Sequence, residues 1–233
     1  VESLKSKLKG EAGKPLEDEE PDGGRPLKLG PTVIQLPAGT VKPVGEGHRV
    51  VYVNDEDDLL VLDAQTGVAG WAVRRGFDNG WLPAAGEVRD SLVSVVAWRQ
   101  GKRLYVSSLK SRSGVTNWTR RMPSEGNELW QAPFVRQSSV FVVMEDGLVL
   151  QLDLASGRTL SRVRLPEAMA GPGVLDVQAG RLACLGRKLG TYVVELSPTL
   201  SVKDVQVRDR PSGVGQAHAV WVSSVLMLLS NSS

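Results

Sequence analysis

The sequence has a single cysteine, Cys184, and only two histidines, His48 and His218. One cysteine excludes a disulfide within the chain, and two distant histidines do not supply the clustered ligands of a structural zinc site. Cys184 lies in the apolar run 182–185, so we expect a buried thiol that acts as a small hydrophobic side chain. The sequence therefore predicts neither a thiol nucleophile nor a metal centre.

Long hydrophobic runs and an excess of one charge are also missing. No run of 18 apolar residues occurs, so we predict no transmembrane helix in this chain. The formal net charge of +2 does not favour a nucleic-acid binder. The nucleophile-elbow and P-loop motifs are absent, which leaves hydrolase and nucleotide chemistry without support. Hydrophobic residues still make up 41% of the 233 residues, enough to form a core.

Residues 1–30 differ in composition from the rest of the chain. Charged residues dominate there, including the acidic run 17–20, which precedes Pro-Asp-Gly-Gly at 21–24. So few apolar side chains cannot offset the entropy of ordering, and we predict a charged linker or tail. The end of an upstream helix at 1–8 and a docking role for the acidic run remain alternatives. The folded domain is expected at 31–233.

From residue 32 onward, short apolar runs with strong β propensity alternate with turn residues, which is typical of an all-β domain. The expected strands are 41–44, 49–53, 59–64 and 71–75; 84–88, 92–98, 103–109 and 116–122; 129–135, 139–144, 148–154 and 160–165; 174–177, 181–185, 191–196 and 202–207; and 217–222 with 225–229. This makes about four and a half four-stranded antiparallel units. We expect them to belong to a larger ring; alternatively, 32–36 pairs with the last half-unit and closes a small one.

A turn motif returns at the same point of successive units. Its most complete copy spans 63–71, and the glycines of the first three copies are 47 and then 43 residues apart. A period of this length in a strand-rich chain indicates a β-propeller with one blade per repeat. Polar residues and glycine suit the turn, while the tryptophan offers a flat surface to the next blade. The structural residues of the repeat are Asp63, Thr66, Gly67, Trp71, Gly114, Trp118, Asp153 and Gly157.

The motif resembles that of the PQQ-like (quinoprotein-type, BamB-like) β-propeller family, whose blades read roughly Ala-x-Asp-x-x-Thr-Gly-x-x-x-Trp. Residues 61–71 match every position but the first, and 151–157 match the front half, with Ser161 in place of the tryptophan. Gly114 and Trp118 match the back half, with Lys110 in place of the aspartate. The resemblance covers about residues 31–233.

The resemblance implies the non-enzymatic branch. Enzymatic members hold PQQ and calcium in an eight-bladed ring, often with adjacent cysteines, and no stretch here carries that metal set by position. We therefore expect no catalytic residues and no cofactor, but an extracytoplasmic scaffold that binds protein partners within an envelope or membrane-associated assembly. The alternatives are a fragment of a PQQ- and calcium-dependent dehydrogenase, and a carbohydrate- or polymer-binding module.

Candidate contact residues lie in two loops and on the outer strands. The acidic hairpin 54–58 is expected to be a solvated tip, with a calcium site as the alternative. Arginines follow the tryptophan position of each repeat, where they either protect a strand edge or form a basic rim for an acidic partner. The candidates are Asp55, Asp57 and Asp58; Asn79 and Trp81 in the loop 78–83; and Arg74, Arg75, Arg120, Arg121, Arg162 and Arg164.

Overall fold

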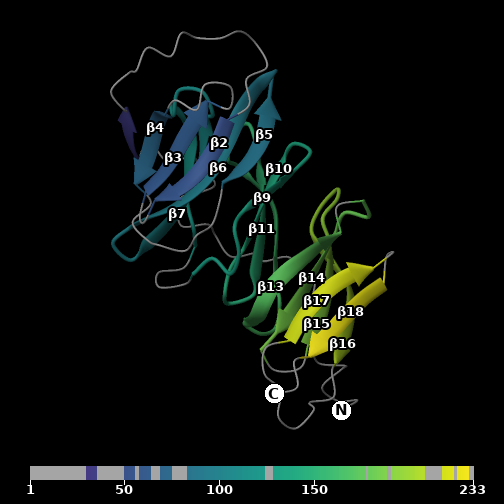
Figure 1. Cartoon of the computed structure of the whole chain (residues 1–233). Helices are drawn as coiled ribbons and strands as arrows, with labels where there is room; N and C mark the ends of the chain where they lie inside the picture. The colour runs from purple at the N-terminus through teal and green to yellow at the C-terminus, as the bar shows by residue number, and fades with distance from the viewer. Residues whose placement is uncertain are drawn as a thin grey trace.

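The computed structural model describes residues 30–35, 50–55, 58–63, 69–74, 83–123, 128–176, 178–187, 190–207, 217–222 and 225–230. All regular structure in these ranges is β-strand, arranged as four four-stranded antiparallel sheets and one two-stranded sheet (Figure 1). In this part of the chain there is no helix that could cross a bilayer. The predicted all-β architecture of four-stranded antiparallel blades is confirmed.

The strands mostly fall within a few residues of their predicted positions. In chain order they are β1 (Thr32–Gln35), β2 (Val50–Asp55), β3 (Asp58–Asp63), β4 (Ala69–Arg74), β5 (Ala84–Val88), β6 (Ser91–Gln100), β7 (Arg103–Lys110), β8 (Thr116–Arg121), β9 (Phe134–Arg136), β10 (Ser139–Val143), β11 (Leu148–Asp153), β12 (Thr159–Arg164), β13 (Met169–Asp176), β14 (Arg181–Gly186), β15 (Gly190–Glu195), β16 (Ser201–Val207), β17 (Ala217–Val222) and β18 (Val225–Ser230). The strand predicted at 41–44 lies outside the described residues. β9 is shorter than predicted because Pro133 cannot donate to a ladder, and only an isolated bridge from Leu129 to Met144 precedes it.

We call the sheets blades 1 to 4 in chain order: β1–β4, β5–β8, β9–β12 and β13–β16. Blades 2, 3 and 4 each run in order from their first strand to their last. The yellow hairpin β17–β18 lies beside β13, the first strand of blade 4 (Figure 1). β10 is buried throughout because its alternate side chains face different neighbours. Val140 and Val142 pack against blade 2, whereas Phe141 and Val143 pack against blade 4.

Blades 1 and 2, and blades 2 and 3, are joined by the same tryptophan contact, which we call an indole seam. The Trp71 indole N–H donates to the Ser111 carbonyl at 3.0 Å, and the Trp118 indole N–H donates to the Leu154 carbonyl at 2.8 Å. Each ring lies against the motif glycine of the next blade. A β-carbon on Gly157 would come 2.6 Å from the Trp118 ring, so only glycine lets the indole approach this closely.

Blades 3 and 4 are joined without an indole. Ser161 stands in the tryptophan position, and its hydroxyl accepts a 3.1 Å hydrogen bond from the Leu200 amide. Thr199 occupies the position of the motif glycine in blade 4. Beside Ser161, Gln151 is 4% exposed, and its Oε1 atom finds no hydrogen-bond partner among the described residues. The tryptophan and the glycine that would receive it are therefore replaced together at this seam.

β1 does not close a ring in the described structure. The alternative pairing of 32–36 with the C-terminal half-unit is wrong, because β1 pairs antiparallel with β4 on the outer side of blade 1, with Thr32 opposite Arg74. The side chain of Val33 packs into the core between blades 1 and 2, next to Gly114. Blade 1 therefore has an outer strand that the motif positions alone did not predict.

Candidate interaction surface

Three ion pairs, of Arg99, Arg164 and Arg187, lie at one end of the blades, which we call the hairpin face. It is the end of the blades at which β2 leads into β3, β6 into β7, β10 into β11 and β14 into β15. Backbone hydrogen bonds fix these segments side by side: the Glu145 amide donates to the Glu128 carbonyl, and the Met169 amide donates to the Glu145 carbonyl, both at 2.8 Å. These bonds hold the part of the hairpin face that belongs to blades 3 and 4 together as one surface.

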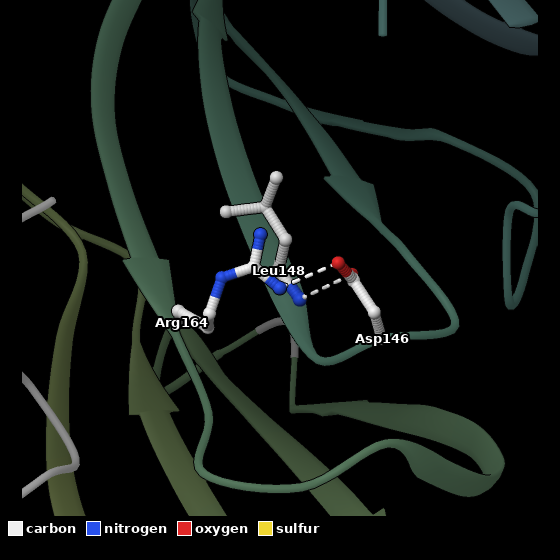
Figure 2. Close-up of polar contacts among 3 residues, drawn as sticks. All are labelled: Asp146, Leu148 and Arg164. Carbon is white, nitrogen blue, oxygen red and sulfur yellow. Dashed lines mark hydrogen bonds and ion pairs between the residues drawn. The ribbon is translucent and has the colours of Figure 1, made fainter. Parts of the chain in front are cut away.

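The β10–β11 turn is held by the Asp146 carboxylate (Figure 2). Its Oδ1 atom accepts from the Leu148 amide at 3.1 Å, and its Oδ2 atom accepts from Arg164 Nη1 at 2.5 Å. Gly147 supplies the left-handed residue of this turn with φ of +89°. Arg164 is thus tied to the hairpin of its own blade, although about two-fifths of its side chain stays exposed, at 41%.

Two further ion pairs connect segments that are distant in sequence. Arg99 at the end of β6 pairs with Glu128, and Arg187 after β14 pairs with Glu145 of the neighbouring blade. The Arg187 guanidinium also lies over the Trp130 ring, 5.7 Å from its centre, and its Nε–H donates to the Met169 carbonyl at 3.0 Å. Arg187 therefore fastens blade 4 to blade 3 across this face.

A buried carboxylate lies beneath the same end of blade 4. Glu167 is 6% exposed, and its Oε1 atom accepts from the Gly190 amide at 2.7 Å and from the Tyr192 hydroxyl at 2.8 Å. The close approach explains the glycine at 190, because a β-carbon there would come 2.4 Å from the same oxygen. Glu167 therefore anchors the β14–β15 hairpin to the connection between blades.

The acidic hairpin of blade 1 lies at the hairpin face, but its turn is shorter than expected. β2 runs to Asp55 and β3 starts at Asp58, and these two residues face each other in the ladder. The ladder therefore continues into the expected five-residue tip 54–58 as far as the pair Asp55 and Asp58. Asp57, Asn79, Trp81 and Arg75 lie outside the described residues, as do Thr66 and Gly67 of the repeat. The role of these candidates remains a prediction.

The arginines near the tryptophan positions do not form one exposed rim. Arg74, Arg121 and Arg164 lie three residues after the tryptophan position, and β4 is not an edge strand because β1 covers it. Arg74 is exposed, while Arg121, Arg162 and Arg164 are partly buried. Edge protection therefore does not explain Arg74.

Arg120 is buried, at 4% exposed, and its Nη2 atom donates to the Thr159 hydroxyl of the next blade at 3.2 Å. Burial lowers the pKa of its guanidinium from the ordinary value. It follows Trp118 by two residues and so points to the same side of β8, toward blade 3. Including Arg120 in a solvent-facing rim was wrong. Because side chains alternate between the two faces of a strand, the position of Trp118 two residues earlier places Arg120 between the blades.

The sequence predicted the strands of the β6–β7 hairpin, but its basic turn was not among the candidate contact residues. Lys102 and Arg103 are exposed at its turn, where Gly101 has φ of +59° and open space around it. The clustering of basic residues in blade 2 was the available signal.

The described residues do not fit a catalytic metal or a reactive thiol. No three histidine, cysteine, aspartate or glutamate side chains come together in these ranges as a metal site would require. Cys184 is fully buried, and burial raises the pKa of its thiol to about 12. The arrangement is suited to holding blades together and to presenting charged turns.

The family model for the outer membrane protein assembly factor BamB matches residues 30–178, which contain both indole seams. The chain belongs to the BamB family. The search of curated proteins found no match.

Two solved structures share the propeller fold of this BamB-family chain. BamB from Moraxella catarrhalis superposes with a TM-score of 0.52 at 16% identity, over 78% of this chain and 58% of that one. The dihydro-heme d1 dehydrogenase NirN, in complex with DHE, superposes with a TM-score of 0.54 at 16% identity, over 78% of this chain and 39% of that one. The chain thus spans only part of the length of both, and the fold does not choose between scaffold and enzyme.

Proposed function

We propose that this chain is a non-catalytic scaffold that binds a protein partner through its hairpin face, within an extracytoplasmic assembly at an envelope or membrane. The observation that carries the proposal is the charged, cross-braced end of the blades. Ion pairs and backbone hydrogen bonds fix its turns, and a fixed framework that presents exposed loops is how propellers and related folds bind partners. Membership of the BamB family supports the same function and compartment.

The main competing function is that of a PQQ- and calcium-dependent dehydrogenase, which the structural likeness to the dehydrogenase NirN suggests. The described residues do not fit that site. They bring no group of acidic ligands together, and the buried carboxylate of Glu167 already accepts hydrogen bonds from Gly190 and Tyr192. We therefore assign no chemical step to these residues.

Affinity capture of the tagged chain from native extract tests the proposal. We expect one protein partner to remain bound after a high-salt wash, because a specific interface has a desolvated core that salt does not screen. Failure to retain any protein at low or high salt would contradict it. A rise in melting temperature with PQQ and calcium would support the dehydrogenase instead, since a ligand of the folded state stabilises that state.

A further inference from the structure

Positive charge is concentrated in a single blade. Residues 83–123, which contain blade 2, hold eight basic and two acidic residues, a net charge of +6 in a chain whose total is +2. Part of this charge lies at the hairpin face, where Lys102 and Arg103 are exposed and Arg99 pairs with Glu128. Blade 2 therefore carries a positive charge that the net charge of the whole chain conceals, and the Lys102–Arg103 turn exposes part of it at the hairpin face.

The β6–β7 hairpin also reaches further than the corresponding hairpins. β3, β11 and β15 each begin five residues before the first motif position of their blade, whereas β7 begins seven residues before Lys110. Because the motif turns occupy equivalent positions, the second strand of this hairpin runs two residues further toward the hairpin face than its counterparts, or about 7 Å at roughly 3.3 Å per residue. The β10–β11 turn has two more residues than the β6–β7 turn, so the tip of the basic hairpin lies about one residue beyond that of blade 3.

The hairpin is stiffened at its base. Trp98 and Tyr105 face each other across the ladder, with ring centres 4.5 Å apart, and both are nearly fully buried. The Trp98 indole N–H donates to the Ser107 hydroxyl at 2.7 Å, so its polar atom is satisfied inside the blade. A cross-strand aromatic pair of this kind stabilises the ladder and keeps the turn in one orientation.

We propose that the β6–β7 hairpin recognises an acidic segment of the protein partner, with Lys102 and Arg103 as its contact residues. This rests on the proposed scaffold function and names the chemistry of the partner. A nucleic acid fits less well, because nearby Trp98 and Tyr105 are buried and offer no face for a base to stack on. A membrane surface also fits less well. The exposed large apolar side chains of the described residues lie elsewhere: Leu92 and Val115 at the opposite end of blade 2, and Leu160 on β12 of blade 3.

Binding of a short fluorescein-labelled oligoglutamate to the full chain, followed by fluorescence anisotropy, tests the inference. We expect Lys102→Glu/Arg103→Glu to weaken binding about tenfold or more, because two attractive exposed contacts become repulsive. Arg89→Glu/Arg181→Glu is the matched control: both residues are exposed at the opposite end of their blades, and the charge change is the same. The control should change affinity by less than about twofold, and thermal melting should show both variants folded.

Equal losses of oligoglutamate affinity in the two variants would overturn the inference, because binding would then depend on the net charge of the chain and not on the β6–β7 turn. Absence of oligoglutamate binding, or stronger Lys102-dependent binding to phosphatidylserine vesicles or oligothymidine, would overturn it as well. Capture from extract separates the two proposals. A partner retained by Lys102→Glu/Arg103→Glu leaves the scaffold standing and removes the hairpin's role, whereas no partner for the unaltered chain contradicts the scaffold itself.

Discussion

The glycine of each indole seam is required for two reasons that can be separated: its left-handed backbone conformation and its close approach to the indole ring. Gly157 has φ of +71°, and a β-carbon there would collide with Trp118, whereas Gly101 has φ of +59° and open space. We expect Gly101→Ala to cost about 1–2 kcal/mol of unfolding free energy for the left-handed backbone. Gly157→Ala should cost about 1–3 kcal/mol more from overpacking.

A double-mutant cycle in denaturant titrations isolates the second cost. In a Trp118→Ala background, Gly157→Ala should cost no more than Gly101→Ala, because the ring that it would strike is gone. Additive losses in the cycle would show that the indole and the glycine do not contact each other as described.

Cys184 predicts a dependence of stability on alkaline pH. Its folded pKa of about 12 lies above the ordinary value of 9.0, so the thiol ionises in the unfolded chain before it ionises in the folded one. Its contribution is fully present below pH 9 and is lost as pH rises toward 12, at about 1.4 kcal/mol per pH unit. Subtracting the unfolding free energy of Cys184→Ala from that of the unaltered chain at each pH should reveal this slope. Parallel curves would show that the thiol is accessible.

Residue-scale features were predictable where they depend on local pattern. The burial of Cys184 followed from its apolar neighbours, and an Asp-Gly pair between two apolar runs is the local pattern that suits the left-handed Gly147. The burial of Arg120 depends on which face of β8 meets the next blade, and that face is fixed by Trp118. Counting from Trp118 identifies Arg120 as buried, whereas its charge alone suggested exposure.

At the scale of elements, β1 is the feature that local sequence could not place. Its β-branched residues Thr32, Val33 and Ile34 suit a strand but do not name the strand with which it pairs. The pairing with β4 rests on Val33, which fills the space between blades 1 and 2. Strand positions elsewhere were predictable because turn residues flank each apolar run. The extra length of the β6–β7 strands, in contrast, becomes evident only when they are compared with the strands of the other blades.

Val33→Asp tests the position of β1. A carboxylate in that apolar space should lower the unfolding free energy by about 1–3 kcal/mol, and the amides of β1 should exchange hydrogen faster. Thr32→Asp is the control because Thr32 is exposed on the same strand, and it should change stability by less than about 0.5 kcal/mol. Equal effects of the two substitutions would contradict the docking of Val33.

Across the whole molecule, the seams differ in strength. Blade 2 is held by an indole seam on each side, whereas blade 4 meets blade 3 through Ser161, Leu200 and the incompletely satisfied Gln151. We expect hydrogen exchange to give the amides of β14 and β15 an opening free energy at least about 1 kcal/mol lower than those of β6 and β7. A uniform opening energy would show that the chain opens as one unit.

The central claim is that the hairpin face is the surface that binds a partner. A photo-cross-linking residue at Gln100, exposed beside the β6–β7 turn, tests it most directly when compared with one at Ala155, exposed at the opposite end of blade 3. In native extract, the account predicts a specific cross-linked protein from Gln100 and none from Ala155. Cross-linking from Ala155 alone, or from neither position, would contradict it.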